Sequence, residues 1–446
     1  MLSITCPNDN IPERRYVINV LFNHLLNCDL PSDCIHFDDS ADSYIIKKDN
    51  KIIEIEDHFF HHYATFPLEY LNISNIPSGI STFHALGKEV PLVFGNDTYY
   101  QDNERVKIGL DIFASTFFLL SHWDEYCTGG EGGFTYDNRC FTKKQNIYLR
   151  AVVHEYEYLL SELLGITSQR QFKCLITHDV DSLVDLSWIG VCKMLFCSLL
   201  SFRRAAFKKT IKDIGLKLHY PRPYTQASRY VSLSQKYGID EMFFIKTCAR
   251  GEVGVTYPYD GEAIQEVINW LNSQHSSNSI KIGFHPSEST FNNQKQWDVE
   301  VSRIKGLLKC VPLYGRNHHL LCNHFTFCQW ESLGTSDGQR ATMSNKVFGG
   351  SIGFRSSIAV PFPIFDIRQR REMRLYELPC EIMDTAVMYR IRNSSEQETM
   401  EEIVKVVDEV KKYRGQLVLN WHMLRRPAGQ FKYLVKICDK ILQYAL

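Results

Sequence analysis

From residue 171 onward, short apolar runs alternate with amphipathic segments along the chain. Four of the runs have the length of buried strands, at 172–177, 242–245, 279–284 and 416–420. Between them, apolar residues recur at three- and four-residue spacing, which predicts helices around 264–271, 297–308 and 400–410. The last of these helices is expected to begin at the capping box Ser395-x-x-Glu398 and to stop at Gly415. Alternating strands and helices indicate an α/β fold with a parallel sheet, either open or closed into a barrel.

The first part of the chain follows a different pattern. Alternating residues at 44–46 and 51–55 predict a β-hairpin that turns at Asp49-Asn50, and the apolar spacing of 111–126 predicts a helix. This stretch carries no obvious chemistry. We therefore expect a smaller α/β accessory domain at 1–168, followed by a catalytic-type domain at 169–446.

Composition and charge narrow the class of protein. The 446 residues are 44% hydrophobic and 23% charged, which is ordinary for a globular protein, and the net charge of −1 argues against a nucleic-acid binder. The fourteen cysteines form no C-x-x-C pair, so reduced thiols are expected. The N-terminal residues lack the basic and apolar regions of a secretory signal. These features together predict a cytoplasmic protein.

One segment departs from this neutral average, an insertion at about 189–220. Its apolar run, 189–202, is too short to span a bilayer, which takes about 20 residues. A basic amphipathic stretch follows, with six Lys and Arg residues between 203 and 217. Two interpretations stay open. The segment either lies on the surface of an anionic membrane at its inner face, or forms ordinary helices with a solvated basic face.

Chemistry collects directly after the apolar strands. Asp179 and Asp181 follow the first strand, His285 follows the third, and further polar residues follow later runs: Arg316, His318, His319, Glu381, Asp384 and His422. The carboxyl ends of parallel strands share one edge of a sheet, where active sites form. Carboxylates and imidazoles are ligands for Zn²⁺ or a similar divalent ion, and a second carboxylate can act as general base. This pattern predicts a metal-dependent hydrolase.

The same residues resemble the motifs of NodB-like polysaccharide deacetylases. Thr177-His-Asp-Val-Asp181 resembles the first motif and Lys281-Ile-Gly-Phe-His-Pro-Ser287 the second. Later stretches resemble further motifs in the expected order: Gly315-Arg-Asn-His-His319, Gly353-Phe-Arg-Ser356 and Leu419-Asn-Trp-His422. The stretch 117–126 also resembles an uncharacterised domain that precedes such catalytic domains in bacterial proteins. The resemblance implies a distorted (β/α) barrel with fewer than eight strands.

The resemblance also implies roles for individual residues. Asp179 would be the general base, Arg316 would orient it, and His422 would be the general acid. Asp181 and His285 would hold the metal. The second His of the family's metal motif is missing, because Lys281 and Ser289 stand at the two positions where it would be expected. His318, His319 or water would complete the site, and we take His318 as the third ligand.

The implied reaction is hydrolysis of an N- or O-acetyl group on a sugar of a bacterial polysaccharide or its precursor, free or lipid-linked, with Zn²⁺ as the expected metal. We expect Arg355, Asp384 and Trp421 to contact this substrate. The missing His motivates an alternative, in which a degenerate deacetylase fold binds glycan without turnover.

Overall fold

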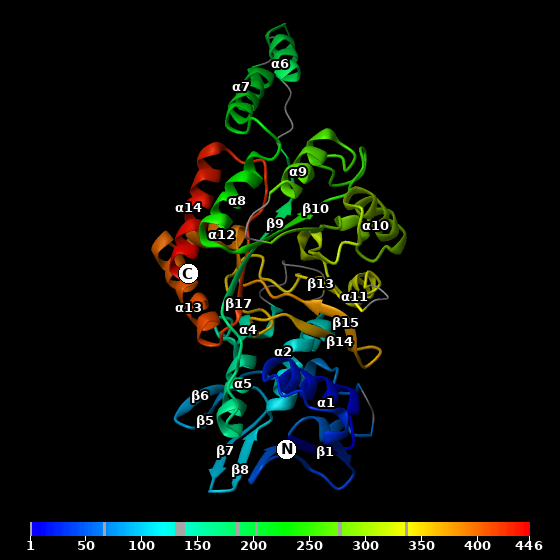
Figure 1. The fold of residues 1–446 in the computed structure, drawn as a ribbon, viewed down its shortest axis with the longest axis vertical. Coiled ribbons are helices and arrows are strands. Elements are labelled where there is room, and N and C mark those ends of the chain that lie inside the picture. The colour runs from blue at the N-terminus through cyan, green and yellow to red at the C-terminus, as the bar shows by residue number, and fades with distance from the viewer. Residues whose placement is uncertain are drawn as a thin grey trace. The chain divides into compact units, whose positions relative to one another are not determined.

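A computed structural model of the chain describes residues 2–65, 68–129, 139–183, 188–200, 204–274, 279–334 and 338–446. The chain forms two compact units (Figure 1). Unit 1 comprises Met1–Lys173 and His319–Leu417, and unit 2 comprises Cys174–His318 and Val418–Leu446. Each unit is thus assembled from two separate stretches of sequence. The sequence predicts a boundary between two modules at residue 168. The compact units do not test this boundary, so it stays a prediction.

The N-terminal part of unit 1 is built on a six-stranded sheet, visible in cyan and blue in Figure 1. Its strands follow the order β2 (Ile35–Asp38), β1 (Leu2–Pro7), β3 (Ser43–Lys48), β4 (Lys51–Glu56), β8 (Arg105–Leu110) and β7 (Gly95–Gln101). The antiparallel pair β3–β4 confirms the predicted hairpin. Alternate isoleucines of these strands are fully buried, so one face of the sheet forms a core. A separate two-stranded sheet joins β5 (Ser81–Ala85) and β6 (Lys88–Leu92).

The helix predicted at 111–126 is divided in two. α2 (Ile112–Ser121) begins where the Asp111 carboxylate accepts a hydrogen bond from the amide of Ala114, at 2.9 Å. It ends at His122, whose left-handed backbone (φ 53°) cannot continue a helix, and α3 (Trp123–Thr128) starts anew. The His122 ring is buried with Nε2 2.8 Å from Ser356 Oγ, and this long-range contact is outside the reach of a local pattern.

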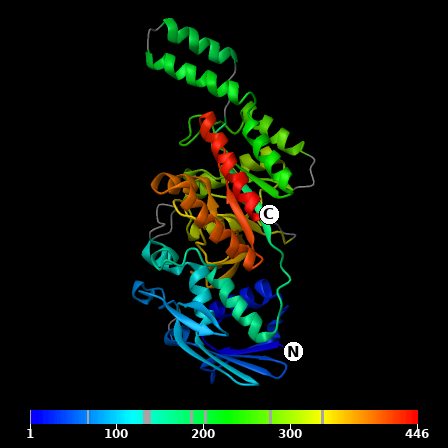
Figure 2. The ribbon, with the colours of Figure 1, turned by 90° about the vertical axis from the view of Figure 1, so that its left-hand side faces the viewer.

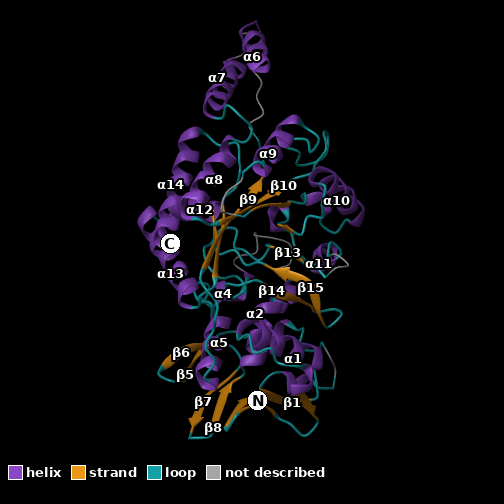
Figure 3. Ribbon diagram, viewed as in Figure 1, coloured by secondary structure: helices purple, strands orange, loops and turns teal. Residues whose placement is uncertain are grey.

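The remaining elements of unit 1 are helices and four strands, seen by type in Figure 3. The helices are α1 (Ile11–Ile18), α4 (Phe141–Lys144), α5 (Val152–Leu164), α11 (His324–Glu331), α12 (Asp384–Asn393) and α13 (Glu396–Lys412). The strands are β14 (Phe362–Asp366), β15 (Arg371–Glu377), β13 (Ala341–Met343) and β16 (Ile382–Met383). The predicted cap of α13 is present, since Ser395 Oγ accepts from the amide of Glu398 at 3.1 Å.

Unit 2 contains the parallel strands expected from the alternating pattern. They follow the order β12 (Tyr314–Gly315), β11 (Ile280–Phe284), β10 (Asp240–Ile245), β9 (Lys173–Val180) and β17 (Gln416–Asn420). Apolar faces of α8 (Thr225–Tyr237), α9 (Glu262–Asn272), α10 (Gln294–Leu308) and α14 (Ala428–Ala445) are buried in this unit.

The expected distorted barrel is not closed by the described strands. Their order is linear, and no pairing links its two ends. In a closed barrel every strand is hydrogen-bonded to a neighbour on each side, and the strands share a matched tilt and register. β12 has only two residues, so it can form few hydrogen bonds with neighbouring strands. The fold is therefore mixed α/β with an open sheet.

The insertion forms two helices, α6 (Trp188–Leu200) and α7 (Arg204–His219), which lie side by side in Figure 2. In the ranges that the structure describes, no helix combines the length and the apolar character needed to cross a bilayer.

Candidate functional site

Side chains from four parallel strand ends of unit 2 meet at one edge of its sheet. Backbone hydrogen bonds continue past the strands and hold each residue in register. The amide of His285 donates to the carbonyl of Ile245, and the amide of Arg316 donates to that of Phe284. The result is one cluster of the residues predicted from the strand ends: Asp179, Asp181, His285, Arg316, His318 and His422.

Asp179 lies at the centre of this cluster and is 3% exposed. Its Oδ1 accepts from Arg316 Nη1 at 2.9 Å, and its Oδ2 accepts from Asn420 Nδ2 at 3.1 Å. His422 Nε2 lies 3.5 Å from Oδ2. The carboxylate is thus held on both oxygens, by Asn420 of the neighbouring strand β17 and by Arg316, which directly follows β12.

The charges around Asp179 favour its ionised form. Burial by itself raises the pKa of this carboxyl, but the Arg316 guanidinium, with His285 and His422, lowers it below its usual value. Arg316 is fully buried, and its Nη1 also donates to Thr177 Oγ1 at 3.1 Å. A buried charge pair of this kind keeps the Asp179 carboxylate ionised and fixed in position.

Asp181, two residues further on, meets two imidazoles. Its Oδ1 lies 3.3 Å from His285 Nε2 and 3.5 Å from His318 Nε2, and Lys246 Nζ is 3.9 Å away. Burial raises the pKa of Asp181, but the hydrogen bond and charge of His285 dominate and hold it well below its usual value. The two rings are nearly perpendicular, with centroids 5.4 Å apart.

The orientation of His285 is determined by its other ring nitrogen. Nδ1 lies 2.5 Å from the carbonyl oxygen of Arg316, which can only accept, so Nδ1 carries the proton. Nε2 is thereby directed at Asp181 Oδ1, and it would offer its lone pair to a cation bound between them. Metal-binding histidines in proteins are commonly oriented by such a bond from the second nitrogen.

The three side chains fit a divalent cation. One ligand atom from each of Asp181, His285 and His318 lies within 4.8 Å of the others. Ligands about 2.0–2.2 Å from a tetrahedral Zn²⁺ are separated by roughly 3.3–3.6 Å. Asp181 Oδ1 lies 3.3 Å from His285 Nε2 and 3.5 Å from His318 Nε2, and both distances match that range. Two nitrogens and one carboxylate oxygen are also a donor set that Zn²⁺ accepts.

The choice between His318 and His319 follows from a turn. Both were expected on a strand, but β12 ends at Gly315 and a short 3-10 turn covers His318–Leu320. The amide of His318 donates to the carbonyl of Pro286, which holds this residue beside the second motif. His319 has a left-handed backbone (φ 58°) and is exposed.

Several residues of the site were not predicted. Asn420 and Thr177 contact Asp179 and Arg316 directly, and Lys246 follows β10 just as the predicted residues follow their strands. The same pattern, a polar residue directly after a strand, therefore also points to Lys246 after β10. Glu300 offers no such signal. It accepts from the amide of Ser287 at 3.0 Å from within α10, and so supports the loop after His285.

His178 belongs to the first motif but faces away from the cluster, because successive strand residues alternate between faces. Its ring is buried between Tyr230 and Phe243, with centroids 4.5 and 4.6 Å away. Nδ1 meets the carbonyl oxygen of Trp421 and Nε2 meets Glu241 Oε1, both at 2.7 Å. His178 therefore stabilises β9 on the face of the sheet opposite the cluster.

One expected substrate contact, Trp421, does not line the cluster of unit 2. The Trp421 side chain is fully buried and its Nε1 donates to the carbonyl of Leu434, so its indole packs in the core of unit 2. Arg355 and Asp384 belong to unit 1, where both are buried. Arg355 pairs with Glu125 Oε1 there, at 3.0 Å. The role of Arg355 and Asp384 in substrate binding stays a prediction.

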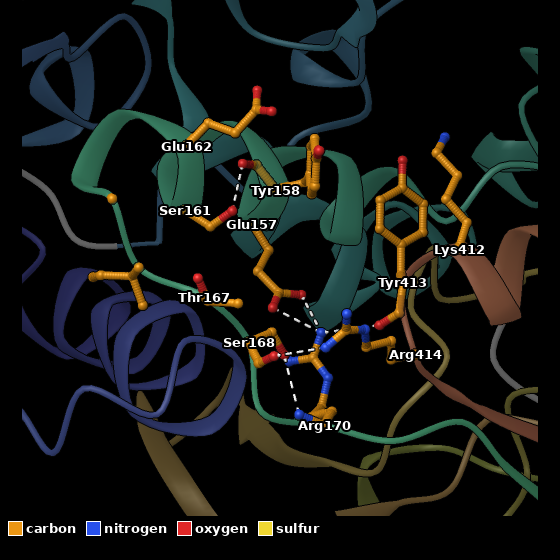
Figure 4. Close-up of a pocket in the computed structure, with 12 residues that line it drawn as sticks. Glu157, Tyr158, Ser161, Glu162, Thr167, Ser168, Arg170, Lys412, Tyr413 and Arg414 are labelled. Carbon is orange, nitrogen blue, oxygen red and sulfur yellow. Dashed lines mark hydrogen bonds and ion pairs between the residues drawn. The ribbon is translucent and has the colours of Figure 1, made fainter.

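A surface pocket in unit 1 lies at the end of α5 and is shown in Figure 4. Its two arginines are held by neighbouring groups. Arg170 Nη2 lies 2.7 Å from the Glu157 carboxylate and also donates to the carbonyl of Tyr413. Arg414 donates to the carbonyl of Ser168 at 3.1 Å. These contacts hold residues 166–170 against their neighbours, which indicates a structural role.

Comparisons with known proteins give limited similarity. Residues 2–168 match a family of unknown function, DUF7033. No curated protein is significantly similar to the chain. Among solved structures, the chain is similar to a proposed polysaccharide deacetylase involved in O-antigen biosynthesis from Bordetella bronchiseptica, at 12% identity and a TM-score of 0.30. The match covers 62% of this chain and 85% of that one. Similarity at this level carries no argument about activity, and the relation to NodB-like deacetylases stays a proposal.

Proposed function

We propose that the protein is a metal-dependent deacetylase acting on an acetylated sugar of a bacterial polysaccharide or its precursor. One observation carries the proposal. The ionised, Arg316-held carboxylate of Asp179 lies next to the group Asp181, His285 and His318 at a single sheet edge. A fixed base beside a candidate cation site is the arrangement that hydrolysis of an acetyl group requires.

Asp181, His285 and His318 would hold the metal, most simply Zn²⁺. When bound there, a divalent ion supplies Lewis-acid chemistry, lowering the pKa of water to about 7 and polarising the acetyl carbonyl. His285 is already oriented for this task by its bond to the Arg316 carbonyl. That carbonyl and the guanidinium that holds Asp179 belong to the same residue, so Arg316 links base and metal ligand.

The proton-transfer roles follow from the contacts of Asp179. Its carboxylate, held by Arg316 and Asn420, accepts the proton of the attacking water. His422 Nε2, 3.5 Å from Oδ2, lies on the opposite side of this carboxylate from the guanidinium and donates a proton to the leaving sugar atom. Both groups are buried or nearly so, which strengthens their electrostatic effect.

The experiment measures acetate release from N- and O-acetylated sugars by protein loaded with Zn²⁺, Co²⁺ or Ni²⁺. We expect activity to be lost on chelation and restored by metal. Asp179→Asn and His422→Ala should lower kcat by 100-fold or more while metal content is kept. The matched control is Asp260→Asn, an exposed aspartate of unit 2, which should behave as wild type.

The alternative is a protein that binds acetylated glycan without turnover. It is motivated by the missing second His of the metal motif, which leaves a ligand set drawn from three strand ends. Sugar binding in calorimetry, with no acetate release under any metal, would support this alternative. Activity that survives both chelation and Asp179→Asn would exclude the proposed mechanism.

A further inference from the structure

The helical insertion α6–α7 carries an uneven distribution of charge. Between residues 188 and 220 the sequence has seven Lys and Arg residues and a single acidic one, Asp213. Asp213 is buried and paired with Arg425 Nη2, so its negative charge is neutralised within unit 2. The exposed charge of this segment is therefore entirely positive.

One face of α7 is anchored to unit 2. Thr210, Asp213 and Leu216 are buried, and Tyr220, just after the helix, donates from its hydroxyl to the carbonyl of Arg426. The Tyr220 ring also packs on Phe431 of α14, with centroids 5.6 Å apart. These contacts set which side of α7 faces its own unit.

The opposite side of α7 presents apolar side chains to solvent. Phe207, Ile211 and Leu218 are 39%, 50% and 66% exposed. At 100° per residue these three positions lie within about 40° of one another around the helix, roughly opposite the anchored side chains. Lys208 and Lys212 are exposed along one flank of this stripe.

α6 repeats the same arrangement. Phe196, Leu199 and Leu200 occupy one side of the helix at i, i+3 and i+4, and each is more than half exposed. Lys193 is exposed on the same helix, which contains no acidic residue. Large apolar side chains in such a cluster are costly to leave in water, and they mark an interaction surface.

We propose that the exposed apolar faces of α6 and α7 dock on the surface of an anionic lipid bilayer. The complementary charge selects this occupant: lysines border the apolar stripe, as in helices that lie in the plane of the headgroups. At 13 and 16 residues the helices measure about 20 and 24 Å, too short to span but sufficient to lie flat. The proposal does not depend on the deacetylase activity.

The test is flotation of the full-length protein with vesicles of phosphatidylcholine alone or with 30% phosphatidylglycerol. We expect flotation with the anionic vesicles only, weakened by 0.5 M NaCl. Lys208→Glu/Lys212→Glu should lower the partition coefficient at least about 30-fold, because each basic residue near the surface contributes roughly a factor of five. Phe196→Ser/Leu200→Ser should lower it roughly 100-fold through lost apolar burial.

The matched control is Val299→Ser/Lys295→Glu on α10, which removes an exposed valine and an exposed lysine from a helix of the same unit. It should float as wild type does. Equal flotation with neutral vesicles, no flotation at all, or an equal loss in the control would overturn the proposal. Sedimentation without vesicles adds one further outcome. Self-association abolished by Phe196→Ser/Leu200→Ser, without lipid binding, would assign this face to a second copy of the chain instead.

Discussion

The contact between Arg316 and Asp179 makes the strongest prediction for the site. Arg316 is fully buried and Asp179 is 3% exposed, and their charged atoms are 2.9 Å apart. Arg316→Met keeps much of the side-chain volume and removes the charge. It leaves a buried carboxylate whose remaining polar neighbours are Asn420 and His422.

The expected magnitude follows from this burial. Removing one partner of a buried ion pair costs about 3–5 kcal/mol, and because Asn420 still donates to Asp179, we expect about 3 kcal/mol for Arg316→Met. Asp179→Asn leaves the Arg316 guanidinium buried without the Asp179 charge, and it should lower the free energy of unfolding by a similar amount. In the double variant neither charge is left alone. The double variant then loses hydrogen bonds but leaves no buried charge unpaired, so the two effects should fall short of their sum by at least about 2 kcal/mol.

The assay is urea unfolding of the metal-free protein at pH 7, followed by tryptophan fluorescence, for wild type, both single variants and the double variant. Chelator in every sample removes any contribution from bound metal. A coupling energy below about 0.5 kcal/mol would show that the two charges do not interact in the folded protein. The account of Asp179 as a base held by Arg316 would then be wrong.

Three further predictions test other parts of the molecule. His285→Ala should lower Zn²⁺ affinity at least 100-fold in a competition titration, whereas Asp260→Asn should leave it unchanged. Gly283→Ala should lower the melting temperature by several degrees, because its Cβ would lie 2.3 Å from the carbonyl oxygen of Tyr314; an unchanged melting temperature contradicts this packing. Burial lowers the pKa of His122 to about 4. Between pH 6.5 and 4 the unfolded chain therefore binds more protons than the folded protein does. The free energy of unfolding should fall by roughly 3 kcal/mol as the pH drops through that window. His122→Asn, which tolerates the left-handed backbone, should remove this slope in urea unfolding, and an equal slope in both proteins refutes it.

Much of the architecture of unit 2 could be derived from local pattern. The strands β9, β10, β11 and β17 lie where the apolar runs predict them, because a buried strand must be apolar over four to eight residues. The parallel arrangement follows from the helices between them. The polar residues that follow these strands predict that Asp179, Asp181 and His285 share one edge of the sheet.

Tertiary structure decided what each of those residues touches. The sequence left His318 and His319 undecided, and the turn after β12 brings His318 to Asp181. Trp421 had seemed a substrate contact, but its neighbours in unit 2 bury it. Such outcomes depend on which elements pack together across hundreds of residues, and local periodicity carries no information about that.

By itself, the sequence determined the α/β class, the strand ends that carry chemistry and the basic character of the insertion. These properties depend on side-chain type and on spacing within a few residues. Only the tertiary structure decided that the sheet stays open, that Asn420 also holds Asp179, and that α7 turns its apolar stripe toward solvent. The physical reason is that hydrogen-bond pairing and burial are relations between distant segments, and they exist only once the chain has brought those segments together.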